Sequence, residues 1–402
     1  MALVDIESEL NDPECAVRDQ AHKFAEEVMR PAGAQLDRLA DPADVMARDS
    51  VLWQVFDRFR ELDFDALESP DPDVTPGQAA RLRFLVNEEL GWGDSGLAIS
   101  LGVAGFHRFF AKLSGRPELI ERFCAAGSRE IGCWAVTEPD HGSDTLAFDQ
   151  PQFRDAKLRA NCIARREGDA WVVRGQKSAW VSNGTIATVA ALFCTIDPSH
   201  GFEGGGVAIV PLDLPGVSRG KPLDKIGQRA LNQGEIFFDE VRIPETYMVV
   251  GKEAYGFVVE QVLAMANAAM GTIFVGVARA ALEHALAYSH ERIQGGLPIF
   301  RHQSVKARLF KAFTQVEAAR ALARRVALYN ATQPPLVQYS IASKVFCTQT
   351  AFEVASGAVQ IFGGNGLSRE YPIEKLLRDA RASMIEDGCN DLLSLVGAEK
   401  LW

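Results

Sequence analysis

The residues whose types and spacing are most informative lie between Gln360 and Gly388. A QIFGGNG turn follows one apolar helical pattern, and the next helical pattern ends in Asp387 and Gly388. Glycines let a backbone approach phosphate closely, because a Cβ would block the contact. A carboxylate such as Asp387, once a bound apolar ligand desolvates it, has a raised pKa and can take a proton from carbon. The segment therefore pairs a phosphate-binding pattern with a candidate base.

Glu386 and Asp387 compete for the role of base. If both lie on the helix, their side chains point about 100° apart, so only one of them faces a ligand. The resemblance of this segment to a known enzyme family implies that Asp387, and not Glu386, is the base. The competing interpretation is that Asp387-Gly388 is only a common turn pair.

Two further segments complete the pattern. Residues 134–144 read WAVTEPDHGSD, and residues 175–184 read GQKSAWVSNG. Together with QIFGGNG and EYPIEKLLRDAR at residues 370–381, they resemble the motifs of the acyl-CoA dehydrogenase family. The resemblance extends over essentially the whole chain. Most members carry glutamate at the base position, whereas this chain carries Asp387.

The resemblance implies an enzyme that uses flavin adenine dinucleotide (FAD) to desaturate an acyl thioester at Cα–Cβ. Asp387 would take the α-proton while hydride passes from Cβ to flavin N5, with the thioester carbonyl polarised at the same time. Reduction places negative charge near flavin N1 and O2, which donors such as the Thr137 hydroxyl stabilise. The implied contacts of the flavin ring and ribityl chain are Trp134, Val136, Thr137, Trp180 and Ser182.

The resemblance also implies a cofactor site shared between subunits, and hence a homotetramer. An arginine at the phosphates would supply planar donors to the pyrophosphate. The remaining implied cofactor contacts are Arg292, Gln303, Gln360, Gly363, Gly364, Cys389 and Asp391. Gly142 and Ser143 would lie where the carrier arm of the substrate passes. Electrons would leave to an electron-transfer flavoprotein or a similar acceptor.

Several positions depart from the family pattern. Asn267 stands where members carry an Arg that helps hold the pantetheine arm, and Gly295 replaces a usual Phe near the adenine. Residues 148–157 lengthen the loop after Ser143, and one additional residue before Trp180 implies a bulge or a shifted start of the motif. Some members place the base on the first long C-terminal helix, but residues 265–270 contain no carboxylate, which favours Asp387. The changes at Asn267 and in residues 148–157 border the acyl channel that the resemblance implies, and they predict an unusual acyl group or an unusual carrier. The carrier is either coenzyme A or a carrier protein.

Two other functions fit the same fold. Asp387 also resembles the base of nitroalkane oxidases, flavin enzymes that deprotonate a carbon acid and pass electrons to dioxygen. A flavoprotein used only for binding, like the DNA-associated members, is disfavoured by the net charge of −11.

Three composition zones predict an α+β fold that positions these motifs. Residues 1–129 form an N-terminal helical domain, with a loop at residues 68–73. Short β-type runs at residues 130–245 form a middle antiparallel β-sandwich or barrel. Residues 246–402 form a C-terminal bundle of long helices, over residues 254–293, 303–330 and 337–362.

Bulk properties predict a cytoplasmic enzyme. The acidic pI of about 5.3 argues against nucleic acid or an anionic membrane as a partner. No leader pattern and no uninterrupted apolar span is visible. Seven cysteines without a CxxC pair, and seven histidines without ligand spacing, predict neither a disulfide framework nor a metal site.

Overall fold

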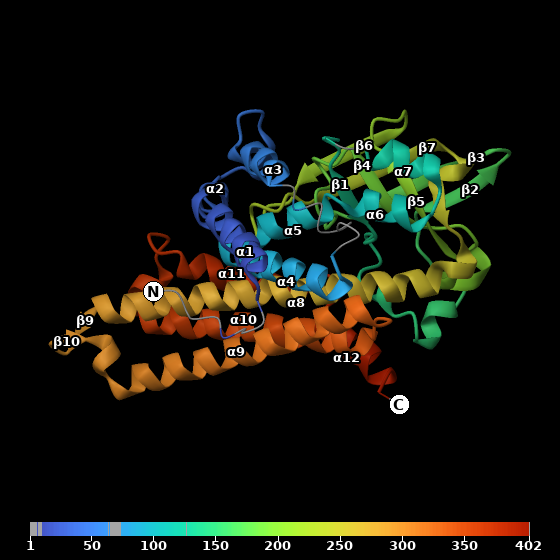
Figure 1. Cartoon of the computed structure of the whole chain (residues 1–402). Helices are drawn as coiled ribbons and strands as arrows, with labels where there is room; N and C mark the ends of the chain where they lie inside the picture. Colours follow the sequence, from blue (N-terminus) through green and yellow to red (C-terminus); the bar gives the residue numbers. More distant parts are fainter. Residues whose placement is uncertain (1–5, 7–9, 63, 65–73, 126, 402) are drawn as a thin grey trace.

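A computed structural model describes residues 6, 10–62, 64, 74–125 and 127–401. Figure 1 shows helices, a β-sheet and a bundle of long helices, in that order along the chain. The loop predicted at residues 68–73 lies outside the described residues. The predicted α+β architecture with its three zones is confirmed.

Short helices make up the N-terminal part, and their starts are encoded locally. Asn11 and Glu14 form a capping box at the first helix, and Thr75 and Gln78 form another at the fourth, each followed by a proline at the start. The helices are α1 (Asp12–Phe24), α2 (Arg30–Asp37), α3 (Val51–Glu61), α4 (Pro76–Gly93), α5 (Ser95–Val103), α6 (Phe106–Leu113) and α7 (Pro117–Phe123).

Within residues 127–250, all of which are described, eight strands form one sheet in the order β6-β7-β3-β2-β4-β5-β8, with β1 beside β4. Most pairs are antiparallel, but β1 and β2 each pair with β4 in parallel. The strands are β1 (Gly132–Ala135), β2 (Ile163–Glu167), β3 (Ala170–Lys177), β4 (Val189–Thr195), β5 (Gly205–Pro211), β6 (Val217–Pro222), β7 (Gly234–Pro244) and β8 (Met248–Val250).

The expected bulge lies slightly earlier than the additional residue that suggested it. The register of β3 against β7 shifts between Val173 and Gly175. Gly175 has φ of +138°, and a Cβ there would lie 2.6 Å from the Cα of Cys162. Only glycine fits this bend, which directs the end of β3 toward Trp180.

Long helices form the C-terminal bundle at nearly the predicted bounds. They are α8 (Lys252–Glu291), α9 (Gln303–Thr332), α10 (Val337–Phe362), α11 (Ile373–Ser383) and α12 (Asn390–Glu399). Among the described residues, α8 alone is long and apolar enough to cross a bilayer by length and composition, and 83% of that window is buried inside the protein. Such burial is typical of the core helix of a globular protein.

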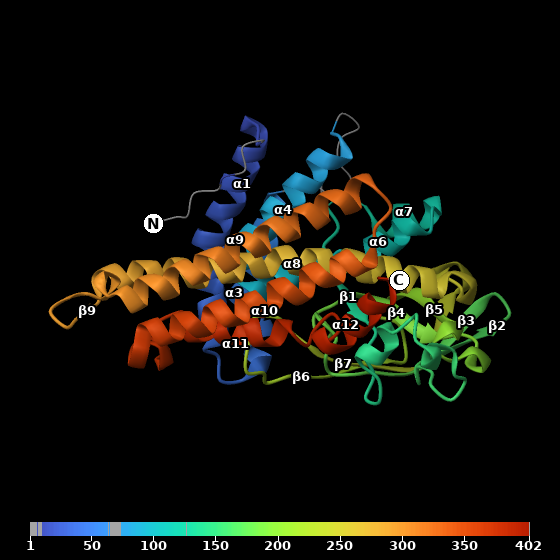
Figure 2. The same cartoon turned by 90° about the horizontal axis from the view of Figure 1, so that it is seen from below.

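A small hairpin, β9 (Ile293–Gln294) and β10 (Leu297–Pro298), joins α8 to α9. In Figures 1 and 2 this hairpin and the β-sheet lie at opposite ends of the bundle. The predicted contacts of the flavin ring lie in or beside the sheet, whereas Arg292 and Gln303 flank the hairpin.

Candidate active site

Asp387 lies in a turn between α11 and α12, not on a helix. Helix α11 ends at Ser383, and Asp387 and Gly388 both have positive φ, +53° and +91°. The expectation that Glu386 and Asp387 are neighbours on a helix is therefore wrong. Asp387 is one of few residue types that adopt the left-handed region at modest cost, and Gly388 adopts it freely. We call residues 384–390 the base turn.

The two acids of the base turn have different surroundings. The Gln228 side-chain amide donates a hydrogen bond to Glu386 Oε1 at 2.5 Å. Burial, together with the charge of Asp387, raises the pKa of Glu386 to about 7. Glu386 is thus held by the β-domain, which leaves Asp387 as the acid without a fixed partner.

The Asp387 carboxylate accepts no hydrogen bond from any residue that the structure describes. Burial raises its pKa to about 6, although the positive charge of Lys344 opposes the rise. A carboxyl with a pKa near 6 is ionised at neutral pH and still basic enough to accept a proton, which is the balance that general-base catalysis requires.

The base turn is attached to three separate elements. Ser143 Oγ accepts a hydrogen bond from the Cys389 backbone N–H at 3.0 Å, which links the turn to η4 (Ser143–Leu146). Lys344 of α10 donates to Gly388 O, and Gln228 holds Glu386 from the loop before β7. Ser143, predicted at the substrate arm, therefore lies beside the predicted base.

The EYPIEKLLRDAR motif anchors α11, the helix that leads into the base turn. Lys375 Nζ lies 2.6 Å from Asp94 and 2.5 Å from Asp379, and all three side chains are largely buried. Arg378 bonds both carboxylate oxygens of Asp37, at 2.9 and 2.6 Å. Ion pairs thus fix α11, and with it the start of the base turn, against α2 and against Asp94 at the junction of α4 and α5.

The five predicted flavin residues come together at one edge of the sheet. Trp134 lies in β1, and Val136 and Thr137 follow it. Thr137 O accepts a hydrogen bond from the Ser178 N–H at 2.8 Å, which places the segment after β3 beside the end of β1. The amide of Gln233 then donates to Trp180 O at 3.2 Å and to Ser182 Oγ at 3.3 Å.

Two side chains at this edge fit a planar, partly polar cofactor. Trp180 is 56% exposed, which is unusual for a tryptophan packed beside a sheet. Trp134 stacks on Phe106 with ring centroids 5.3 Å apart, and its indole Nε1 is buried without a partner among the described residues. A ring that covers Trp180 and carries acceptors would satisfy both observations.

The predicted dinucleotide residues lie elsewhere in the chain. Arg292 and Gln303 are exposed beside the β9–β10 hairpin, and Gly363 and Gly364 are exposed where α10 ends. A Cβ added at either glycine would meet nothing within 4 Å. Gln360 is sixteen residues beyond Lys344 on α10, about 24 Å along the helix at 1.5 Å per residue. One chain alone therefore does not bring these residues to Asp387.

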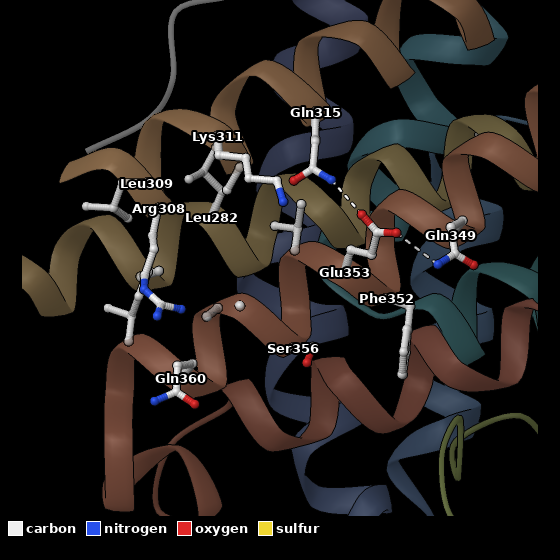
Figure 3. Close-up of a pocket in the computed structure, with 16 residues that line it drawn as sticks. Leu282, Arg308, Leu309, Lys311, Gln315, Gln349, Phe352, Glu353, Ser356 and Gln360 are labelled. Carbon is white, nitrogen blue, oxygen red and sulfur yellow. Dashed lines mark hydrogen bonds between the residues drawn. The ribbon is translucent and has the colours of Figure 1, made fainter. Parts of the chain in front are cut away.

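Gln360 lines a cavity of about 570 Å³ among α8, α9 and α10, shown in Figure 3. Arg308 and Lys311 of α9 line the same cavity as Gln360 and provide two positive charges. Glu353 accepts hydrogen bonds there from Gln315 at 2.7 Å and Gln349 at 3.0 Å. Sequence reasoning missed Arg308 and Lys311, although both lie on the α9 helical pattern one and two turns after Gln303.

The remaining predicted positions are also placed. Asp391 is exposed in the first turn of α12, and Gly142 precedes η4. Asn267 is fully buried on α8 and its Oδ1 has no partner among the described residues. The lengthened loop folds onto the core through Phe153, which packs near Phe202 and Tyr255. In the described part of the chain no group of three or more metal-binding side chains forms.

Comparisons with known proteins agree with this arrangement. A family model of the acyl-CoA dehydrogenase middle domain matches residues 133–241, and one of the C-terminal domain matches residues 256–401. An acyl-CoA dehydrogenase of Bacillus subtilis is 35% identical over 277 residues, 67% of this chain and 68% of that protein.

Two further relatives extend the likeness to the full chain. The mitochondrial short-chain specific acyl-CoA dehydrogenase of Mus musculus is 29% identical over 401 residues, 98% of this chain and 91% of that protein. The structure of butyryl-CoA dehydrogenase from Megasphaera elsdenii superposes with a TM-score of 0.85 at 26% identity, covering 98% of this chain and 100% of that one. The chain belongs to the acyl-CoA dehydrogenase family of FAD-dependent oxidoreductases.

Proposed function

We propose that this enzyme desaturates an acyl thioester at Cα–Cβ, with Asp387 as the base. The observation that carries the proposal is the base turn: a carboxylate without a hydrogen-bond partner among the described residues, with a pKa of about 6, in a backbone conformation fixed from three elements. Aspartate is one methylene shorter than the usual glutamate. The left-handed turn supports its use, because it can bring the backbone closer to the substrate.

FAD, when bound, supplies the acceptor for the hydride that leaves Cβ. Trp134, Thr137 and Trp180 are the residues that would hold its ring, and the unpaired Trp134 Nε1 and the exposed face of Trp180 support that placement. Asp387 would receive the α-proton. The hydrogen bond from the Cys389 N–H to Ser143 Oγ is one of the contacts that hold the base turn in place. Burial of the acid next to the apolar acyl chain would exclude water from the proton transfer.

The separation of Asp387 from Gln360 supports a cofactor shared between subunits. Arg308, Lys311 and Gln360 line one cavity, and positive charges with an amide suit a pyrophosphate. The open space at Gly363 and Gly364 gives a neighbouring dinucleotide room to approach the backbone. We infer a homotetramer, with an electron-transfer flavoprotein or a similar protein as the acceptor of electrons.

The substrate is inferred to be an unusual acyl group or an acyl group on an unusual carrier. Asn267 stands where the family pattern has an arginine, so α8 carries no positive charge at that point. The Asn267 Oδ1 is a buried acceptor without a partner among the described residues, and a hydrogen bond from the substrate would satisfy it. The loop at residues 148–157 contributes the buried side chains of Phe148 and Phe153, which belong to the same apolar cluster as Leu263 of α8.

The test is anaerobic mixing of the purified flavoprotein with a panel of acyl-CoA thioesters, acyl-carrier-protein thioesters and nitroalkanes. Bleaching of the flavin absorbance by a thioester is the expected result, with electrons passed to an added acceptor faster than to dioxygen. Bleaching by nitroalkanes alone, with rapid oxygen consumption, would instead show the oxidase of the same fold. Failure of every compound to bleach the flavin would overturn the proposed desaturase activity.

A further inference from the structure

Lys344 is a fully buried lysine that the proposed reaction does not use. It lies on α10, and its side chain is 0% exposed. Its Nζ donates to Gly388 O and to Asn390 Oδ1, each at 2.8 Å. These acceptors lie after Asp387 in the base turn and at the start of α12. One side chain thus joins α10 to both.

The contacts around Lys344 form a small network on α10. Thr348, one turn further along the helix, donates from its hydroxyl to Lys344 O at 2.8 Å. The amide of Asn390 donates to the same Thr348 hydroxyl at 3.0 Å. Asn390 is therefore fixed by two residues of α10, and its orientation presents Oδ1 to the ammonium group.

Both acceptors of Lys344 are neutral, so its charge needs an anion nearby. Burying an ammonium group without a counter-charge is costly, and burial lowers the pKa of Lys344 to about 8. The charges of Asp387 and Glu386 oppose this lowering and favour the ammonium form at neutral pH. No direct ion pair joins Lys344 to Asp387, so the carboxylate stays available to a substrate. The nearby positive charge of Lys344 still lowers the pKa of Asp387.

We propose that Lys344 is a positioning residue, which holds the base turn against α10 and supplies the positive charge that keeps Asp387 ionised. This inference rests on the proposed role of Asp387. It differs from a direct salt bridge, which would occupy the carboxylate and make it a poorer base.

Other titratable groups lie in the base turn itself and on the elements next to it. Lys225, from the loop before β7, favours ionised Glu386, as does Lys344. Asp144 of η4 is already paired with His141 at 2.8 Å. Cys389 and Glu386 belong to the turn, and Asp391 is exposed on α12. Of these groups, Lys344 is the one whose charge lowers the pKa of Asp387.

The test compares Lys344→Met with Lys344→Arg by the pH dependence of flavin reduction in single turnovers. Without the charge, the midpoint of the acid limb should move up by about one pH unit, so that the rate at pH 6 falls about fivefold more than the rate at pH 9. Arginine keeps the charge and should restore the midpoint. An unchanged midpoint in Lys344→Met would overturn the electrostatic part of the proposal.

Hydrogen exchange provides a readout that needs no substrate. The Cys389 N–H bonds Ser143 Oγ, and the Asn390 N–H bonds Met384 O at 3.0 Å. Faster exchange of both amides is expected in Lys344→Met. Equal exchange in the variant and the wild type would overturn the positioning role, even if no thioester reduced the flavin and the proposed function failed.

Ser340→Ala is the matched control. Ser340 is a buried polar residue one turn before Lys344 on α10, and it accepts a hydrogen bond from Asn330 at 2.9 Å. Its loss removes a buried polar contact without removing a charge. We expect the melting temperature to fall while the pH midpoint and the exchange of the base turn stay at wild-type values. If Ser340→Ala moved the midpoint as far as Lys344→Met, the effect would be one of general stability.

Discussion

At the scale of single residues, the proposed role of Asp387 as the base makes its environment the determinant of the pH dependence of catalysis. The pKa of Asp387 is raised from its ordinary value to about 6, and only the ionised carboxylate can accept a proton. The rate of flavin reduction should therefore rise as the pH increases through about 6 and fall tenfold per pH unit below it. Stopped-flow reduction across pH 5 to 9 checks this expectation.

The neighbouring acid supplies the control for this profile. Glu386, whose pKa is raised to about 7, carries a like charge beside Asp387. In Glu386→Gln that charge is gone, so the acid limb should persist and lie at the same or a lower pH. An acid limb that vanished in Glu386→Gln would show that the profile reports Glu386.

At the scale of elements, a buried ion cluster holds the helices together. Glu88 of α4 contacts Arg279 of α8 at 2.9 Å, and Arg320 and Arg324 of α9 at 3.0 and 3.1 Å. Burial alone would raise the pKa of Glu88, but the three guanidinium groups lower it to about 2. The cluster therefore stays ionised near neutral pH and joins three helices at one point.

Glu88→Gln should lower the free energy of unfolding by about 3–5 kcal/mol, because it leaves buried guanidinium groups without their carboxylate. The exposed pair of Glu61 with Arg58, 2.7 Å apart, is the control. Glu61→Gln should cost at most about 1 kcal/mol, as surface pairs do. Thermal melts of both variants measure these two losses of stability. Equal losses in the two variants would contradict a structural role for the cluster.

Much of the element structure could be predicted because it is encoded locally. Apolar periodicity located α8, α9 and α10 within about two residues, and the short β-type runs located the segment at residues 130–245 that contains β1 to β7. Strands such as β2 and β6 have no clear pattern of their own, because they are largely exposed and carry few apolar residues. The turn at Asp387 was mistaken for helix because its conformation depends on contacts from Ser143 and Lys344, which are distant in sequence.

The site was predictable to the extent that it consists of motifs. The segments that follow β1 and β3, which carry the predicted flavin residues, lie side by side through the hydrogen bond from Ser178 N–H to Thr137 O. The sequence patterns did not identify Lys344, Arg308 or Lys311, because a lysine or arginine on a helix usually points to solvent. Only packing shows that Lys344 is buried against the base turn.

At the scale of the whole molecule, the proposed cofactor site is complete only with a second subunit. Gly364→Glu tests this need, because a Cβ at Gly364 meets nothing within 4 Å in the single chain. The variant should fold, but its carboxylate would repel a neighbouring pyrophosphate. We expect at least a tenfold loss of bound FAD, measured by absorbance after gel filtration, with a native mass that is also smaller.

Gly102→Glu is the matched control for that experiment. Gly102 is an exposed glycine of α5 whose added Cβ also meets nothing within 4 Å. This variant should keep both its FAD and its native mass. Full FAD content in Gly364→Glu would contradict a shared dinucleotide site.

Single-turnover reduction of the flavin by variants of the base turn tests whether Asp387 takes the proton. With a thioester that bleaches the wild type, Asp387→Asn should reduce the flavin about 10³-fold more slowly. Asp387→Glu should recover part of the rate, and Glu386→Gln should stay within about tenfold of the wild type. Reduction by Asp387→Asn at nearly the wild-type rate, or a loss in Glu386→Gln as large as that expected for Asp387→Asn, would contradict the account.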